Sequence, residues 1–513
     1  MRRKYLALAA VLLAAATIIT VRQQPRPFQF HYDHVMGTSL DLTVVARSES
    51  GAHAAAAAVL DRIDRDAKIL SGYDAESEFS RWFATRGQAV RVSDELYEVL
   101  DLFDQWRVRS GGALDASAET VSRAWKRAAS MRRVPTDEEV TAAVDIVRRP
   151  HWRLDAAART ATHLDAAPIV LNSFTKSYIV DRAARAALET GRASAVVVNA
   201  GGDLVTRGRW TETVGITDPL NNADNAAPLA RLAVSDRAVA TSGSYRRGFD
   251  IEGRHYSHII DPRTGRPASD VISATVVADR AADAGALATA FCVLAPEHSE
   301  RLAASVPGAE FLIVLANGNR IQSSGWRALA AHSGRRLRLP NPIASLHAAG
   351  QTGRPEHELT VTVELAQIQG GGRIERPYLA IWIEDKDKVP VRTLTVLYRP
   401  NEARFLADLR AWYRADRLRA LTDGTEIIGS VSSATRSPGR YTFKWDMKDQ
   451  QGKLVAPGTY TINIEAAREH GTYQILRQPM DFSGKAAQVT VPVSSGIELT
   501  AAALDYHPAA GAK

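Results

Sequence analysis

The chain of 513 residues has a single cysteine, Cys292, and therefore no intramolecular disulfide and no lipid-attachment cysteine near its start. Cys292 lies in an apolar run, residues 290–294, which predicts a buried thiol rather than a reactive one. The chain also lacks blocks of one charge: a net charge of +7 is small for this length, and Arg and Asp are interspersed. We therefore expect no nucleic acid partner.

Long hydrophobic runs are rare, and the clearest one stands at the N-terminus. Residues 1–4 are basic, and residues 6–21 form a nearly continuous apolar run that suits a signal peptide and is short for a full membrane span. The small-residue sites at 14–16 are weak cleavage sites. Residues 1–24 are thus predicted to be a signal peptide or an N-terminal anchor, with the rest of the chain in the periplasm or facing it from the inner membrane.

Length and a hydrophobic content of 45% predict two or three globular domains. Residues 28–338 mix an alternating strand at 40–45, an alanine-rich helix at 52–70, a helix at 93–110 with Ser93 as N-cap, and a buried strand at 195–198. This mixture predicts an α+β domain.

The composition changes after a proline-containing segment, residues 339–355, which we interpret as a linker. Short alternating strands then follow at 359–365, 378–383, 393–398, 441–445 and 460–464, with one helix near 402–418. Strands at this spacing predict a mainly-β, sandwich-like domain over 356–495. Residues 496–513 are expected to be a tail.

Three loop segments combine Gly, Ser, Asp, Arg and His, which make poor core material but suit a charged ligand. They are residues 199–203 (NAGGD), 242–244 (SGS) and 257–265 (SHIIDPRTG). His258 is a natural proton acceptor near neutral pH, and the turn that begins at Asp261 can aim the segment that carries it. A lone histidine is more often structural, but this context favours a functional one.

Together with Met36-Gly37-Thr38, residues 70–80 (LSGYDAESEFS), 111–115 (GGALD) and 172–178 (NSFTKSY), these loops resemble the FAD:protein FMN transferase (ApbE) family. Enzymes of that family cut FAD and attach its FMN half to a Ser or Thr of another protein. The second domain resembles a domain of unknown function that accompanies such transferases in bacterial envelopes, through residues 382–384 (WIE), 392–394 (RTL), 445–446 (WD) and 458–460 (GTY).

The resemblance implies specific roles. Tyr73 would stack on the flavin, Lys176 would pair with the pyrophosphate, and His258 with Asp261 would assist the acceptor hydroxyl as AMP leaves. The full set of FAD-binding residues that it implies is Met36, Thr38, Tyr73, Ala113, Leu114, Asp115, Lys176, Asp181, Gly201, Gly202, Asp203, Ser242, Gly243 and Ile260.

The resemblance also implies Mg²⁺, held by an oxygen of residue 173, by a Thr and by an Asp four residues before that Thr on one helix. Here Ser173 and Thr289 are present, but the Asp position holds Gly285. Asp283 would lie about 240° from Thr289 on a straight helix, so we expect an irregular helix start to bring it in. Asn172 and Ser177 also stand where the family pattern has glycine.

Residues 432–435 (SSAT) match the last four positions of the target motif of such transferases, which makes Thr435 a candidate FMN acceptor, although the acidic position falls on Gly429. The leading interpretation is an exported Mg²⁺-dependent transferase that moves FMN from FAD to a Ser or Thr hydroxyl of an envelope electron-transfer protein. A catalytically degenerate FAD-binding or self-flavinylated protein is the alternative. A purely structural envelope protein is disfavoured by the density of loop motifs.

Overall fold

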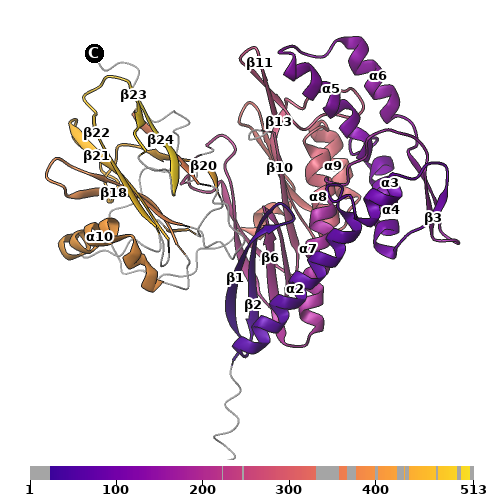
Figure 1. Ribbon diagram of the computed structural model, residues 1–513, viewed down its shortest axis with the longest axis horizontal. Coiled ribbons are helices and arrows are strands. Elements are labelled where there is room, and N and C mark those ends of the chain that lie inside the picture. Colours follow the sequence, from indigo (N-terminus) through magenta and orange to yellow (C-terminus); the bar gives the residue numbers. More distant parts are fainter. Residues whose placement is uncertain are drawn as a thin grey trace, which may run out of the picture. The chain divides into compact units, whose positions relative to one another are not determined.

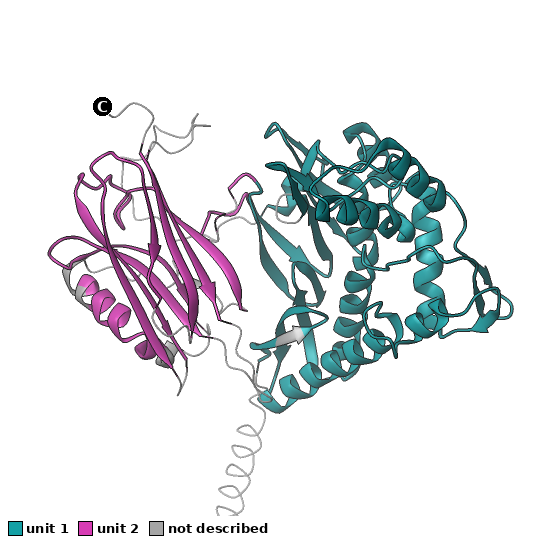
Figure 2. Cartoon of the chain, turned by 45° about the horizontal axis from the view of Figure 1, so that its top comes forward, with its two compact units in different colours: residues 1–219, 230–332 teal, residues 220–229, 333–513 magenta. Residues whose placement is uncertain are grey.

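The computed structural model describes residues 24–221, 223, 225–244, 248–330, 357–366, 377–398, 403–423, 432–433, 438–468, 472–493 and 498–508. The chain forms two compact units, Met1–Pro219 with Ala230–His332, and Leu220–Leu229 with Ser333–Lys513 (Figure 2). The short segment Leu220–Leu229 thus packs with the second unit. There, Asn225 Nδ2 donates to Lys444 O at 2.8 Å and Lys444 N donates to Asn225 Oδ1 at 2.9 Å.

An eight-stranded antiparallel sheet forms the middle of the first unit, in the order β1-β2-β6-β7-β10-β13-β14-β15. Its strands are β1 (Arg26–Val35), β2 (Thr38–Ala46), β6 (Ala193–Ala200), β7 (Asp203–Gly208), β10 (Ala238–Gly243), β13 (Val271–Ala278), β14 (Glu310–Leu315) and β15 (Arg320–Gln322). The strands predicted at 40–45 and 195–198 are confirmed as β2 and β6, which pair with Leu40 opposite Ala200.

Helices cover one face of this sheet (Figure 1). The helices of the unit are α2 (Glu49–Leu70), α3 (Glu78–Phe83), α4 (Asp94–Arg109), α5 (Glu119–Ser130), α6 (Asp137–Val147), α7 (Thr175–Glu189), α8 (Ala281–Phe291) and α9 (Pro296–Ala304). The two predicted helices are confirmed as α2 and α4. Ser93 caps α4 as expected, since its side chain accepts a hydrogen bond from Leu96 N. Cys292 is buried as predicted, which raises the pKa of its thiol to about 12.

Smaller elements complete the first unit. They are the three-stranded sheet of β3 (Ala89–Arg91), β5 (Thr160–His163) and β4 (Trp152–Asp155), the hairpins β8 (Thr211–Ile216) with β9 (Ala230–Ser235) and β11 (Gly248–Ile251) with β12 (Arg254–Ser257), and the 3₁₀ turns η1 (Ala116–Ala118) and η2 (Trp326–Leu329).

The second unit is a sandwich of two sheets, in the orders β20-β16-β24-β23 and β19-β18-β17-β21-β22. Its strands are β16 (Glu358–Leu365), β17 (Tyr378–Glu384), β18 (Pro390–Leu397), β19 (Ser432–Ser433), β20 (Gly439–Trp445), β21 (Thr459–Ala467), β22 (Tyr473–Asp481), β23 (Ala487–Val491) and β24 (Leu499–His507). Alternate residues such as Leu359, Val361 and Val363 are fully buried between the sheets, which confirms the mainly-β prediction.

Two boundaries in this unit differ from the expectation. Residues 496–513 are not a tail, because β24 lies between β16 and β23 and its Leu504 and Tyr506 complete the core. The expected helix at 402–418 is displaced: η3 (Ala403–Asp408) precedes α10 (Arg410–Asp423). The carboxylate of Glu465, which accepts from the backbone N–H groups of Ala411 and Trp412, fixes the start of α10.

Three expectations concern segments outside the described residues: the leader (all but its last residue, 24), the linker 339–355, and Thr435. Within the described residues, no helix has both the length and the apolar character needed to cross a membrane.

Candidate functional site

Two tight turns carry five of the residues predicted to bind FAD. They are Met36, Thr38, Gly201, Gly202 and Asp203. The turn between β1 and β2 has positive φ at Met36 (49°) and Gly37 (72°), and the turn between β6 and β7 has positive φ at Gly201 (57°) and Gly202 (99°). A Cβ added at Gly201 would lie only 2.4 Å from Thr38 Oγ1, so the second turn requires glycine both for its conformation and for its contact. Because β2 and β6 are neighbouring strands with Leu40 opposite Ala200, the two turns lie side by side at the same end of these strands.

Lys176 extends from the first turn of α7 toward the two turns. Its Nζ lies 3.1 Å from Oδ2 of Asp203, the first residue of β7. Burial raises the pKa of Asp203, and the charge of Lys176 and the hydrogen bonds from Lys176 and Ser177 only partly offset it. The Lys176 side chain is 34% exposed, so its ammonium group is fixed by Asp203 but open to a ligand.

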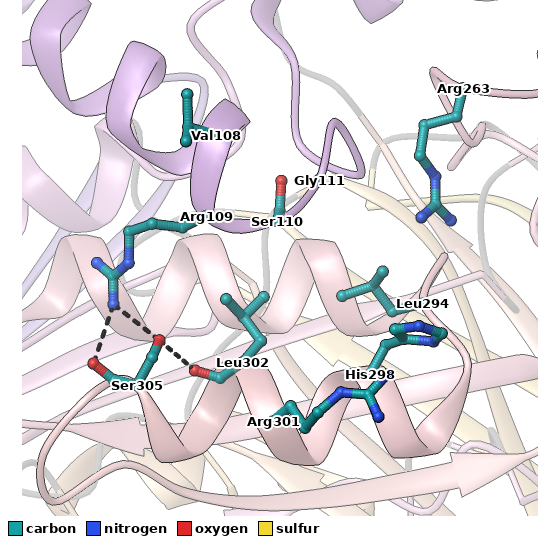
Figure 3. Close-up of a pocket in the computed structure, with 10 residues that line it drawn as sticks. All are labelled: Val108, Arg109, Ser110, Gly111, Arg263, Leu294, His298, Arg301, Leu302 and Ser305. Atoms are coloured by element: carbon teal, nitrogen blue, oxygen red, sulfur yellow. Dashed lines mark hydrogen bonds between the residues drawn. The ribbon is translucent and has the colours of Figure 1, made fainter.

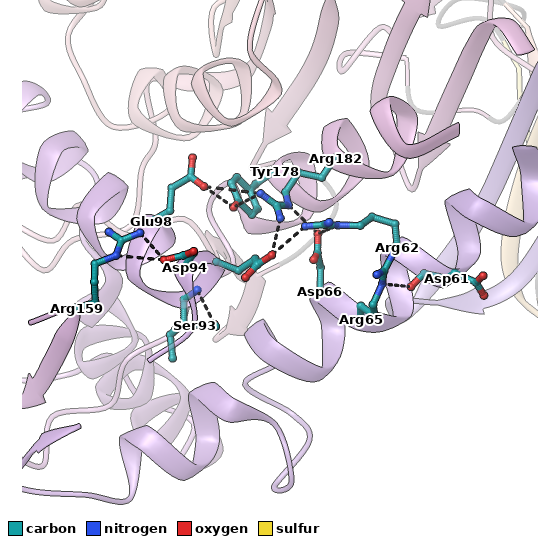
Figure 4. A network of polar contacts seen from close by, with 12 residues as sticks. Asp61, Arg62, Arg65, Asp66, Ser93, Asp94, Glu98, Arg159, Tyr178 and Arg182 are labelled. Carbon is teal, nitrogen blue, oxygen red and sulfur yellow. Dashed lines mark hydrogen bonds and ion pairs between the residues drawn. The ribbon is translucent and has the colours of Figure 1, made fainter. Parts of the chain in front are cut away.

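A partly buried ion-pair network, centred on the buried Asp66, holds α7 in place (Figure 4). Arg182 of α7 donates to Asp66 of α2 at 3.2 Å, to Glu95 of α4 at 2.6 Å and to the Tyr178 hydroxyl at 3.0 Å. Arg62 joins the same two carboxylates, each at 3.1 Å. Three helices are thereby tied together nearly two turns beyond Lys176, which holds the start of α7 in place.

Tyr73 is the most conspicuous aromatic side chain near these residues, with 86% of its surface exposed. Its hydroxyl accepts a hydrogen bond from Asn172 Nδ2 at 2.8 Å. An exposed ring with a tethered hydroxyl offers its face to a flat ligand at low entropic cost. Asn172, one of the two departures from the family's glycines, therefore orients the ring that the resemblance assigns to the flavin.

Three neutral oxygens meet where α7 begins, where β10 ends and in the last turns of α8. Thr289 Oγ1 donates to Ser173 O at 3.3 Å and lies 3.3 Å from Ser242 Oγ. Ser242 is the residue before Gly243, with which β10 ends. Ser173 and Thr289, which we expected to face one Mg²⁺, are in direct contact with each other, and Ser242 lies beside Thr289.

Asp283 does not join these oxygens. Helix α8 is already helical at Ala281, so the irregular helix start that we expected is absent. The charges that act on Asp283 are those of Arg280 and Arg109, and burial raises its pKa. On α8, Asp283 lies about 240° around the helix axis from Thr289, which explains why it faces Arg280 and Arg109 rather than the three oxygens.

Gly285 and Ser177 explain why α8 presents no carboxylate beside Thr289. A Cβ added at Gly285 would lie 2.7 Å from Ser177 Oγ and 3.1 Å from Phe174 Cβ. The serine hydroxyl therefore fills the space through which a longer side chain at 285 would emerge. The two departures from the family pattern, far apart in sequence, are one packed contact.

The residues present do not fit a dedicated Mg²⁺ site. Mg²⁺ in proteins is held by carboxylates together with substrate phosphates and water, whereas Thr289, Ser173 and Ser242 offer neutral oxygens. Asp203 is engaged by Lys176. Among the described residues, no group of three or more His, Cys, Asp or Glu side chains gathers where it could hold a metal ion.

His258 is exposed on a loop whose backbone is well fixed. Ile259 N donates to Ser257 Oγ at 3.0 Å, Ala268 N donates to Ile259 O at 2.8 Å, and the Trp125 indole donates to Gly265 O at 2.8 Å. An exposed imidazole on a rigid loop suits proton transfer to and from a bound partner.

Six acidic or apolar candidates are engaged within the protein itself. Asp261 accepts from Arg263 Nε and Nη2 at 2.9 and 2.8 Å, which positions the loop of His258. Ile260 packs in an apolar cluster against α5 and α6. The other two pairs are Asp115 with Arg107 Nε at 2.8 Å and Asp181 with Arg207 Nε at 2.8 Å. Ala113 and Leu114, in the loop before Asp115, are buried.

Sequence reasoning missed the contacts that Asn172 and Ser177 make. Both were noted only as departures from a pattern. The signal that could have found the second contact is the pairing of opposite changes, a larger residue at 177 and a smaller one at 285, which is typical of two positions that touch.

Comparison with known proteins gives matches for both units. Residues 36–313 match the model of the ApbE family, and residues 358–499 match a family described as a predicted periplasmic protein (DUF2271). Curated relatives named FAD:protein FMN transferase include that of Klebsiella pneumoniae, 28% identical over 60% of this chain and 90% of the relative. That of Treponema pallidum is 29% identical over 56% of this chain and 85% of the relative.

Solved structures agree with this assignment. The ApbE protein of Thermotoga maritima superimposes with a TM-score of 0.53 at 27% identity, over 60% of this chain and all of that one. The ApbE flavinyl transferase of Pseudomonas stutzeri, at 24% identity and a TM-score of 0.51, shows the same fold over 60% of this chain and 98% of its own. Since the family model spans more than half of the sequence and the turns, lysine and histidine loop described above lie within it, this protein belongs to the ApbE family.

Proposed function

We propose that this protein is an exported FAD:protein FMN transferase, which moves FMN from FAD to a Ser or Thr hydroxyl of an acceptor protein and releases AMP. The observation that carries the proposal is the placement of Lys176, which α7 holds beside the two tight turns at the end of β2 and β6. Such an ammonium group suits the FAD pyrophosphate, and the exposed ring of Tyr73 suits the isoalloxazine.

The reaction makes one bond and breaks one. The acceptor oxygen attacks the FMN-side phosphorus, the bond between that phosphorus and the bridging oxygen breaks, and AMP leaves with the electron pair. The hydroxyl proton passes to the imidazole of His258. Lys176 neutralises negative charge on the phosphate oxygens, for which it exchanges part of its interaction with Asp203.

For magnesium, we infer that this chain supplies no carboxylate ligand beside Thr289. The support is the contact between Ser177 and Gly285 together with the regular start of α8. The oxygens of Thr289, Ser173 and Ser242 remain available as hydrogen-bond partners for a phosphate or its water shell.

The acceptor is proposed to be an exported protein. The match of the second unit to a predicted periplasmic family and the apolar N-terminal segment both support export. An envelope electron-transfer protein with a Ser or Thr flavinylation motif remains the expected partner.

The test is incubation of the protein with FAD and a Thr-containing acceptor peptide, with peptide mass and released AMP measured. We expect peptide gaining one FMN for each AMP released. Lys176→Ala should reduce transfer strongly, whereas Lys68→Ala, an exposed lysine on α2, should not. FAD binding without AMP release would instead identify the protein as a flavin-binding member without turnover.

Intact mass of the protein itself tests Thr435 as an acceptor. One added FMN that is lost in Thr435→Ala would identify self-modification, and an unchanged mass beside active transfer would exclude it.

A further inference from the structure

Helix α10 presents a row of arginines to solvent. The helix lies on the outer face of the sheet β19-β18-β17-β21-β22 (Figure 1), where Trp412 is 1% exposed in an aromatic cluster with residues of that sheet. Arg410, Arg414 and Arg417 are exposed and follow the spacing i, i+4, i+7, so they share one face of the helix. Trp412 lies about 200° around the helix axis from Arg410, so this face is turned away from the sheet.

Strand β22 extends the row with residues that point to the same side. Tyr473 and Arg477 are four residues apart on β22 and therefore lie on one side of the sheet. The guanidinium group of Arg410 lies 5.4 Å from the centre of the Tyr473 ring, and that of Arg417 lies 5.7 Å from the centre of the Tyr413 ring. The arginine face of α10 is the set of Arg410, Tyr413, Arg414, Arg417, Tyr473 and Arg477.

Two acids that flank the arginine face are engaged within the protein. Glu465 is fully buried and accepts from the backbone N–H groups of Ala411 and Trp412 at 2.8 and 2.7 Å. Asp416 pairs with the buried Arg419 at 2.9 Å on the inner side of the helix. Within the part of the chain that the structure describes, none of the four arginines of the face forms an ion pair. Their positive charge is therefore left for an external anion.

The arginines of a concave site in the first unit are used differently (Figure 3). This site has a volume of about 440 Å³ and is lined by Arg109 and Arg263, among others. Arg109 donates to Ser305 Oγ at 3.2 Å, and Arg263 donates to Asp261 Oδ2 at 2.8 Å. These two guanidinium groups hold the protein's own segments together, whereas those of the arginine face point into solvent.

The arrangement of the arginine face fits an extended anionic surface better than a single small anion. Arg410 and Arg417 are about 10 Å apart along the helix axis, and no concavity is needed for them to meet a flat partner. A guanidinium group binds a phosphate through two parallel hydrogen bonds, and tyrosine is enriched at the level of lipid headgroups. Since the apolar side of α10 is already buried on its own sheet, such a contact is electrostatic and involves no insertion of the helix.

Two other features of the chain bring a membrane surface within reach. The N-terminus carries a basic and then apolar segment, and the second unit matches a predicted periplasmic family. We propose that the arginine face of α10 binds the anionic phospholipid headgroups of a membrane that bounds the periplasm. The second unit is thereby a module that contacts the membrane surface, a role that goes beyond flavin transfer and does not depend on it.

The test is sedimentation of the full chain, without FAD, with vesicles of phosphatidylglycerol and phosphatidylcholine or of phosphatidylcholine alone. The triple variant Arg410→Gln, Arg414→Gln, Arg417→Gln should bind the anionic vesicles at least about tenfold more weakly than the unmodified chain, because each arginine near an anionic surface contributes about fivefold. Any binding through the N-terminal segment is common to both proteins and cancels in this comparison. The difference should shrink in 0.5 M salt, since about 4 Å of screening length then separates the charges.

The matched control is Arg127→Gln, Arg149→Gln, Arg320→Gln, which removes the same charge from exposed positions of the first unit and should leave vesicle binding unchanged. Circular dichroism checks the fold of each variant. If the triple variant on α10 does not fold, Arg414→Gln with Arg417→Gln keeps the contact of Arg410 with Tyr473 and should show an intermediate loss.

Equal binding of anionic vesicles by the α10 variant and the unmodified chain, or an equal loss in the control, would overturn the proposal. Arginine-dependent binding of soluble polyglutamate, with no such dependence for vesicles, would assign the face to an acidic polypeptide and overturn it as well. Because neither measurement uses FAD, a failure of the proposed transferase activity leaves both readouts unaffected.

Discussion

At the scale of single residues, the site separates acids that are already neutralised from groups that can meet a ligand. Asp115, Asp181 and Asp261 each accept from an arginine close by. Their carboxylates therefore shape loops and helices rather than face a phosphate, which they would repel. Lys176, which is paired with Asp203, and the exposed His258 are the groups that we propose for charge neutralisation and proton transfer.

His258→Ala is expected to lower FMN transfer by about 10²–10⁴ because a general base contributes on that order, while FAD affinity stays within about twofold. Transfer rate and FAD fluorescence quenching measure the two quantities. His255→Ala, an exposed histidine on β12 that pairs with Asp250, is the control and should retain activity. Unchanged transfer in His258→Ala would leave this histidine a structural role only.

Asp104 provides a pH-dependent test of a partly buried acid. Burial raises its pKa from 3.8 to about 6, against the hydrogen bond donated by Trp152. Between these values the folded state holds a proton that the unfolded chain has released, so the free energy of unfolding falls as pH rises through this window. Above the window the cost of ionised Asp104 is fully present.

Asp104→Asn should therefore raise the free energy of unfolding by about 2 kcal/mol at pH 7.5, and by less than half of that at pH 4.5. Urea unfolding of the first unit at the two pH values measures the difference. Asp64→Asn, on the exposed face of α2, should show no such dependence. A stabilisation equal at both pH values would contradict the assigned cause.

At the scale of elements, the approach of α8 to the start of α7 decides what the site can bind. Gly285 allows the two helices to touch, and Ser177 fills the resulting gap while it also contacts Asp203. A close helix contact of this kind excludes any larger side chain at 285 unless the opposite residue shrinks.

Gly285→Asp alone should destabilise the first unit by about 1–3 kcal/mol through overpacking. Adding Ser177→Gly should recover most of that loss and create binding of Mn²⁺, used as a Mg²⁺ substitute, measured by electron paramagnetic resonance without FAD. Thr289→Ala in the double variant should remove the new binding. Tight Mn²⁺ binding by the unmodified protein would show that its own residues do form a metal site.

At the scale of the whole molecule, the residues assigned to FAD all belong to the first unit, and the second unit recruits the segment Leu220–Leu229 from within the first unit's sequence. Asn225 there pairs with the backbone of Lys444. The two units are thus interleaved in sequence, although each has its own core.

A shortened chain of residues 24–332 is expected to bind FAD within about threefold of the full chain, because the predicted ligand residues and their core remain. Fluorescence quenching measures the affinity and circular dichroism checks the fold. Residues 220–229, which lose their packing partner, should be cleaved faster by protease than in the full chain. A folded fragment that cannot bind FAD would place part of the site in the second unit.

The sequence by itself determined the elements whose signals are local. Alternation identified β2 and β16, the Ser93 cap identified the start of α4, and the loop compositions identified the family. The position of α10 and the role of residues 499–507 were misjudged, because Glu465 and the opposing sheet lie far away in sequence.

Only the tertiary structure decided which candidate groups are free for chemistry. Arginines from α4 and β7 pair with Asp115 and Asp181, Asn172 orients Tyr73, and Ser177 closes the space at Gly285. Each of these outcomes depends on which atoms lie within a few ångströms of one another after folding. Ion pairing and exclusion of volume act over such distances in space, and the linear spacing of residues carries no information about them.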